Sequence, residues 1–167
     1  QFVTTVHGQY SVSRFSEIMT RGDRVIAVSG TIQNYISENY PQTPVDRIHT
    51  IYRGVDPAEF PHGYQPSDEW LQNLHREWPN LAGKSLLMLP GRITRLKGHV
   101  DFLKMLVSLR ESGLAAHGLI VGGVDRRKLR YAAEVKRVVA ELGLAGDVTF
   151  TGHRSDMREF YAVSDAV

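Results

Sequence analysis

Short apolar runs alternate along the chain with longer stretches in which apolar residues recur every three or four positions. The runs predict strands at residues 2–7, 24–29, 47–52, 85–89, 118–122 and 148–151. Residues 25–28 and 86–89 are apolar without interruption, which is typical of strands buried on both faces of a sheet. The pattern therefore favours parallel sheets over half-exposed antiparallel ones.

The longer stretches have the periodicity of amphipathic helices and predict two of them, over residues 99–112 and 127–144. Their apolar stripes are Phe102, Leu103, Leu106 and Leu109 in the first, and Ala132, Val135, Val139 and Leu142 in the second. Strands that alternate with helices through short connections predict a doubly wound α/β fold with Rossmann-like sheets.

Proline placement indicates a domain boundary. Five of the seven prolines lie between residues 41 and 66, and none follows Pro90. Proline fixes φ and removes a backbone donor, so it concentrates in linkers and turns. We expect one domain to end at residue 52, a linker over 53–66, and the first part of a second domain over 67–167. The chain opens on a strand-like run and stops at the entry to another strand, so we expect it to be a piece of a longer polypeptide.

Composition excludes several classes of protein. The 167 residues include 20 Lys and Arg against 18 Asp and Glu, 42% hydrophobic residues and no cysteine. Disorder, a disulfide scaffold and a thiolate zinc site are excluded on these grounds. No apolar run approaches the roughly 18 residues of a membrane-spanning helix. The histidines lack metal-ligand spacing, and a net charge of +2 gives little reason to expect a nucleic-acid partner.

Candidate chemistry lies in the loop after the apolar run 86–89. This loop carries Arg92, Arg95 and Lys97 without an acidic residue, and a helix is predicted directly after Gly98. Ligands of open α/β sheets bind beyond the carboxyl ends of the strands, and a helix N-terminus there favours anions. The pattern predicts a phosphate or diphosphate site, and the alternative interpretation is a solvated basic turn.

The loop from Gly91 to Gly98 resembles the donor-diphosphate loop of the retaining, GT-B-fold glycosyltransferases of family 4. Other motifs of that family follow in the same order along nearly the whole chain. They are Thr-Val-His-Gly at 5–8, Val-Ile-Ala-Val-Ser at 25–29, the segment 51–60, Leu-Ile-Val-Gly-Gly at 119–123 and Val-Thr-Phe-Thr-Gly at 148–152.

The resemblance implies a GT-B-type fragment with Rossmann-like parallel sheets, which spans the end of the N-terminal, acceptor-side domain and the first half of the C-terminal, donor domain. It implies a hexosyltransferase-type enzyme that moves a sugar with retention from a nucleotide-diphosphate donor, such as a UDP-sugar, to a hydroxyl acceptor. The acceptor would be a glycan or a lipid-linked, lipopolysaccharide-type molecule of cell-envelope polysaccharide biosynthesis, and the enzyme would work in the cytoplasm without cofactor or metal. The family's pair of glutamates would lie beyond Val167, so the chain alone is expected to lack a complete active site.

Individual roles also follow from the resemblance. Gly91, Arg92 and Lys97 would bind the donor diphosphate, with the two cations neutralising the leaving group. His7, at the end of a predicted strand, would lie near the donor sugar and take part in catalysis. A capping or core histidine is the alternative interpretation of His7.

The nucleotide base would be held at Gly152, His153 and Arg154, chiefly by backbone groups of the last two. Backbone contacts tolerate many side chains, so these residues do not identify the base.

Two alternative functions stay open at this point, and so does the role of one basic cluster. The chain could be a nucleotide- or phosphate-binding module that performs no chemistry, or a nucleotide-sugar epimerase on the same fold. The basic cluster of Arg126, Arg127, Lys128 and Arg130 is either a solvated helix face or a peripheral contact with the anionic lipids of the inner membrane.

Overall fold

The computed structural model describes residues 1–124 and 129–167. The chain divides into two compact units, residues 1–56 and residues 57–167. Each unit contains a three-stranded sheet of its own. The assignment of the units to an acceptor-side and a donor-side domain stays a prediction.

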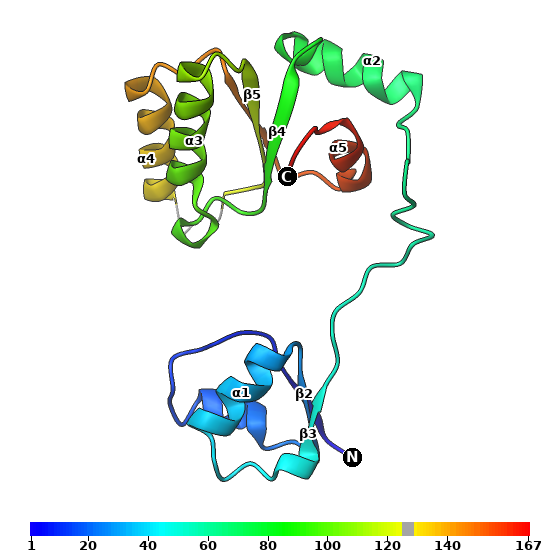
Figure 1. The fold of residues 1–167 in the computed structure, drawn as a ribbon, viewed down its shortest axis with the longest axis vertical. Coiled ribbons are helices and arrows are strands. Elements are labelled where there is room, and N and C mark those ends of the chain that lie inside the picture. The colour runs from blue at the N-terminus through cyan, green and yellow to red at the C-terminus, as the bar shows by residue number, and fades with distance from the viewer. Residues whose placement is uncertain (125–128) are drawn as a thin grey trace. The chain divides into compact units, whose positions relative to one another are not determined.

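The first unit contains a parallel sheet in the order β1-β2-β3. Its elements are β1 (Val3–Val6), the 3-10 turn η1 (Ser16–Thr20), β2 (Arg24–Ala27), α1 (Gly30–Asn39), the turn η2 (Val45–Arg47) and β3 (Ile48–Thr50). The side chain of Ser29 accepts a hydrogen bond from the backbone N–H of Ile32 and so caps the start of α1. Apolar side chains of α1 pack with those of all three strands into one core. Figure 1 shows α1 beside this sheet.

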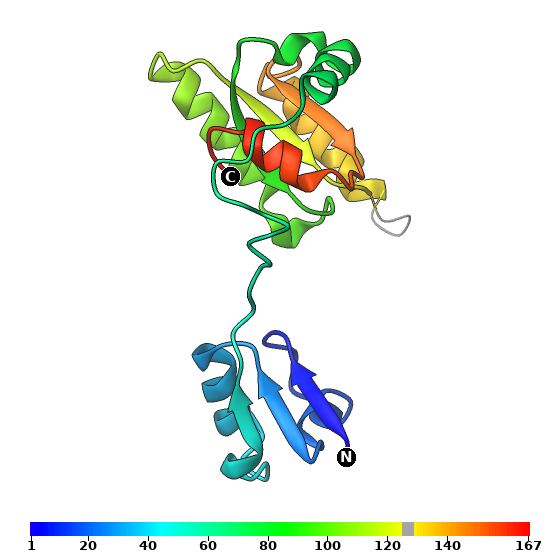
Figure 2. The same ribbon diagram turned by 90° about the vertical axis from the view of Figure 1, so that its right-hand side faces the viewer.

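The second unit contains another parallel sheet, in the order β4-β5-β6. Its strands are β4 (Ser85–Pro90), β5 (Ala116–Val121) and β6 (Val148–Gly152). Its helices are α2 (Asp68–Glu77), α3 (His99–Glu111), α4 (Leu129–Glu141) and α5 (Met157–Val163), with the 3-10 turns η3 (Pro79–Leu81) and η4 (Arg95–Lys97). Helices α3 and α4 cover one face of the sheet, and α2 and α5 cover the other (Figures 1 and 2).

The second unit therefore has a hydrophobic core on each face of its sheet. Along β4, Leu86 and Met88 pack in the core with α2 and α5, whereas Leu87 packs against the core of α3 and α4. Burial on both faces explains the uninterrupted apolar run of this strand and confirms the α/β prediction.

Each strand predicted from the sequence is present, and α3 begins directly after Gly98 as expected. The helix predicted over 127–144 ends earlier, at Glu141, because the chain turns there and the N–H of Leu144 donates to the carbonyl of Val139. The first residues of that prediction lie outside the described residues. At the other end of the chain, Ala166 forms a parallel bridge with Leu87 of β4. The periodicity does not single out α1 or α5, which are short.

Candidate functional site

A cavity of about 450 Å³ opens at the carboxyl ends of the second sheet. Its walls come from the loops that follow β4, β5 and β6 and from α5. It brings together Gly91, Arg92, Lys97, His153 and Arg154, which the sequence analysis singled out in two separate loops. The parallel sheet causes this convergence, since the carboxyl ends of neighbouring strands meet at one edge.

The backbone conformation of Gly91 shapes the loop after β4. Its φ of +133° lies in a region that residues with a Cβ rarely adopt. A Cβ at this position would lie 3.1 Å from Cε of Lys97, so the hydrocarbon stem of that lysine folds back against the glycine. The N–H of Gly91 donates to the carbonyl of Val121 (2.8 Å), and the N–H of the buried Ile93 donates to the carbonyl of Gly123 (3.1 Å). The loop is thereby fixed to the segment after β5.

The three cations of this loop have different surroundings. Arg92 and Lys97 line the cavity, and neither makes an ion pair with any residue of 1–124 or 129–167. Arg95 instead forms an ion pair with Glu134 of α4, and its guanidinium carbon lies 4.8 Å from the ring centre of Tyr131. Two cations are therefore available to an anionic ligand, and the third connects the loop to α4.

The loop after β6 uses its arginine within the fold. Nε and Nη2 of Arg154 donate to the two carboxylate oxygens of Asp156 at 2.9 and 2.8 Å. Nη1 lies 3.4 Å from Oε2 of Glu77, and the guanidinium lies over the rings of Trp78 and Phe160. This side chain is thus neutralised by carboxylates within the fold. The predicted role of the Arg154 backbone in holding a base stays a prediction.

Gly152 does not line the cavity itself. It pairs with Val121 at the end of β6, next to a register shift between Ile120 and Val121. It therefore precedes the two lining residues His153 and Arg154 without contributing to the wall.

Asp156 connects the loop after β6 to α2 through hydrogen bonds from Arg154 and Trp70. Its hydrogen bonds from Arg154, together with one from Nε1 of Trp70 (2.8 Å), lower its pKa to about 2 against the opposing effect of desolvation. A depressed carboxylate pKa adds stability above the unfolded-state pKa of about 4, and this stability is lost as the pH falls through the folded-state value.

We therefore expect Asp156→Asn to lower the free energy of unfolding by about 1–2 kcal/mol near neutral pH, allowing for solvent screening of a partly exposed pair. The difference from the parent protein should shrink as the pH falls from about 4 towards 2. Urea titrations across this range measure it. Glu111→Gln, at an exposed carboxylate at the end of α3, is the control and should change stability by less than about 0.5 kcal/mol. A constant difference across the pH range would contradict this account.

His7 belongs to the first unit, directly after β1. Nη2 of Arg53 contacts its Nδ1. A guanidinium can only donate, so Nδ1 is the acceptor in this contact. The exposed ring is not a core residue, and its predicted catalytic role stays a prediction.

Several lining residues were given no role from the sequence. Gly122 and Gly123 come from the segment after β5, and Met157 and Tyr161 come from α5. A glycine pair at the carboxyl end of a buried strand is a sequence signal for close backbone approach. No sequence pattern indicated the two α5 residues.

Two further predictions concern metals and membranes. Across residues 1–124 and 129–167, no three His, Cys, Asp or Glu side chains lie close enough together to hold a metal ion. Within the same residues, no helix combines the length and apolar character needed to cross a bilayer. Of the basic cluster considered for lipid contact, Arg126, Arg127 and Lys128 lie outside the described residues, and Arg130 is exposed on α4.

Comparison with known proteins gives two family matches. Residues 1–59 match Glycosyltransferase Family 4, and residues 84–167 match Glycosyl transferases group 1. Among curated proteins, none matches this sequence.

Several solved structures are similar. A glycosyltransferase from Rickettsia africae is 28% identical with a TM-score of 0.80, over 98% of this chain and 43% of its own. HepE from Anabaena, solved in complex with UDP and glucose, is 20% identical with a TM-score of 0.75, over 98% and 44%. Sucrose-phosphate synthase from Thermosynechococcus elongatus is 18% identical with a TM-score of 0.73, over 98% and 42%. The chain thus spans less than half the length of each of these proteins.

Proposed function

Because the chain belongs to the glycosyl transferases group 1 family and its parallel sheets are of the GT-B type, we propose that it binds the nucleoside diphosphate sugar used in a glycosyl transfer. The observation that carries this proposal is the pair of cations, Arg92 and Lys97, in one cavity at the carboxyl ends of the sheet. Both lack an ion-pair partner among the described residues, so a diphosphate would supply the missing negative charge.

The two cations would act on the leaving group. As the bond to the sugar breaks, negative charge builds on the departing diphosphate oxygen, and fixed cations stabilise that state more than the ground state. Gly91 allows the stem of Lys97 to lie against the loop, which would hold its ammonium group in place. Arg92 offers a planar pair of donors, and Lys97 offers a compact charge. In our proposal the sugar is a hexose and is transferred with retention, by substitution on one face through an oxocarbenium-like state.

The remaining roles complete the proposal. Backbone groups of His153 and Arg154 would contact the base, since the side chain of Arg154 is committed to Asp156. Crystals of HepE contain UDP and UDP-glucose, which supports a uracil nucleotide here. The catalytic role expected for His7 is also part of the proposal.

We further propose a hydroxyl acceptor on a glycan or lipid-linked molecule of the cell envelope. The reaction would take place in the cytoplasm or at the cytoplasmic face of the membrane, with no resident metal.

Calorimetric titration of the chain with UDP, UMP and uridine tests the proposal. We expect affinity to fall in that order, because each lost phosphate removes a charge-assisted contact with the two cations. Affinity for UDP should fall with added salt and should not change with EDTA. Equal binding of uridine and UDP, or no binding of UDP, would contradict the assignment of this cavity as a diphosphate site.

A further inference from the structure

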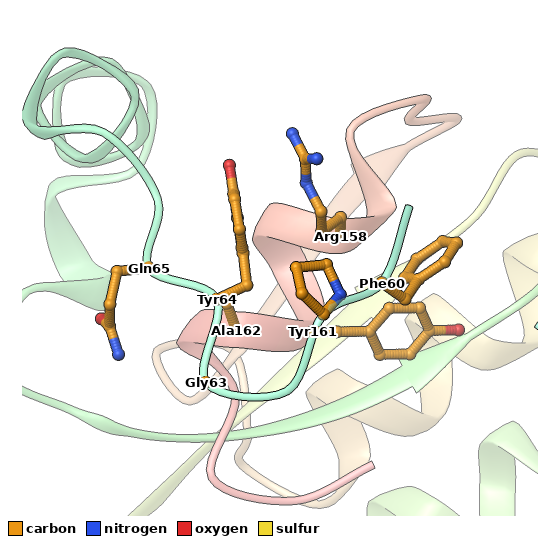
Figure 3. Close-up of a pocket in the computed structure, with 8 residues that line it drawn as sticks. Phe60, Gly63, Tyr64, Gln65, Arg158, Tyr161 and Ala162 are labelled. Carbon is orange, nitrogen blue, oxygen red and sulfur yellow. The ribbon is translucent and has the colours of Figure 1, made fainter. Parts of the chain in front are cut away.

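A second cavity, of about 350 Å³, lies between the segment 60–65 and α5 (Figure 3). All of its lining residues belong to the second unit. Tyr161 lines both this cavity and the one at the sheet edge, so the two lie on either side of one side chain. Otherwise they share no lining residue.

Aromatic side chains form much of the wall. Phe60 and Tyr161 meet edge to face, with ring centres 6.3 Å apart, and lie together at the end of the cavity away from Gln65 (Figure 3). Tyr64 stands between them and Gln65. Tyr161 is 41% exposed, so part of its surface is open to a ligand. Such rings provide flat apolar surfaces on which a ring-shaped ligand can lie.

Two polar side chains of this cavity, those of Arg158 and Tyr64, are connected to each other and to Glu159 beside the cavity. The guanidinium carbon of Arg158 lies 4.1 Å from the ring centre of Tyr64, and Figure 3 shows the two side chains rising side by side. Nη2 of Arg158 and the hydroxyl of Tyr64 both donate to Oε1 of Glu159 at 2.9 Å. Nε of Arg158 is buried and has no hydrogen-bond partner within the described parts of the chain. This atom is hidden from solvent, so the polar side chains that line the cavity and can meet a ligand are those of Arg158, Tyr64 and Gln65.

Charge distinguishes this cavity from the first. The guanidinium of Arg158 is paired with Glu159, whose side chain is only 14% exposed. The pair has no net charge, so it gives no preference for an anion. A neutral ligand with hydroxyl groups fits better, because Arg158 and the amide of Gln65 can donate to its oxygens and the amide oxygen of Gln65 can accept from its hydroxyls.

We propose that this second cavity binds a neutral pyranose unit of a glycan. The apolar face of the sugar ring would lie on the exposed aromatic surface of Tyr161 and Phe60. Its hydroxyl groups would exchange hydrogen bonds with Arg158 and Gln65, which line the cavity. This site is separate from the diphosphate cavity and does not require that the chain bind a nucleotide.

Ala162→Phe tests the proposal. Ala162 lines the cavity on the exposed side of α5, so a phenylalanine there would fill the space without entering either hydrophobic core. Ala133→Phe, at an exposed position of α4, is the matched control. The probe is methyl α-D-glucopyranoside. Its binding is measured by NMR, as saturation transfer from the protein to the sugar protons.

We expect saturation transfer with the parent protein and with Ala133→Phe, and a loss of about tenfold or more in affinity with Ala162→Phe. Arg158→Gln, which removes the guanidinium from the cavity wall, should also reduce transfer. Affinity for UDP, measured in parallel, should be unchanged in Ala162→Phe, because Arg92 and Lys97 are untouched. A failure of the parent protein to bind UDP would therefore count against the nucleotide cavity alone.

Three results would overturn the glycan site. The first is no transfer to the glycoside with the parent protein, and the second is equal transfer with Ala162→Phe. The third is displacement of the glycoside by UDP, which would place the sugar in the cavity at the sheet edge.

Discussion

Lys97→Ala is expected to weaken UDP binding by about tenfold to a hundredfold, because a charge-assisted hydrogen bond to phosphate contributes about 1.5–3 kcal/mol. Lys97 is one of the two cations that line the cavity and make no ion pair with a described residue. Its removal leaves Arg92 to neutralise the diphosphate alone. Calorimetric titration of the variant with UDP at fixed ionic strength measures the loss.

Arg95→Ala is the matched control, since it removes the same charge from the same loop. Arg95 pairs with Glu134 and is 73% exposed, so its loss should cost at most about 1 kcal/mol of stability and leave UDP affinity nearly unchanged. Similar losses of affinity in both variants would mean that only the overall charge of the loop matters. An unaltered affinity in Lys97→Ala would refute the proposed role of this residue.

The difference between Lys97 and Arg95 shows where sequence reasoning reaches its limit. A basic loop between a buried strand and a helix N-terminus can be recognised from residue types alone, since the topology of a parallel sheet fixes its position. Which cation faces the cavity depends on Glu134, which lies 39 residues further along the chain. No local pattern contains that information.

The same reasoning applies to the loop after β6. The sequence placed Arg154 beside the proposed base but could not show that Asp156 and Glu77 would engage its guanidinium. The second cavity is a stronger case, because it forms only where the segment 60–65 lies against α5. Strand positions were predictable because continuous burial leaves a continuous apolar run. Side-chain partners distant in sequence leave no such trace.

Gly122→Ala is expected to destabilise the second unit by about 3 kcal/mol and to reduce UDP affinity. A Cβ at this position would lie 1.9 Å from the carbonyl oxygen of Gly91 and 2.4 Å from its carbonyl carbon. Both are backbone atoms, and the loop that carries them is held by hydrogen bonds to Val121 and Gly123, so it cannot retreat without losing them. Urea titration measures the change in the free energy of unfolding.

Gly146→Ala separates this contact from the general effect of replacing a glycine. No atom lies within 4 Å of the Cβ it would add, so it should leave stability within about 1 kcal/mol of the parent protein. UDP affinity is then compared in the absence of urea, where both variants are folded. A folded Gly122→Ala protein with weakened UDP binding would show that the close approach of Gly122 to Gly91 positions the two cations. Parent-like stability in this variant would show instead that the loop after β4 can move away from β5, and the geometry assigned to the diphosphate site would have to be abandoned.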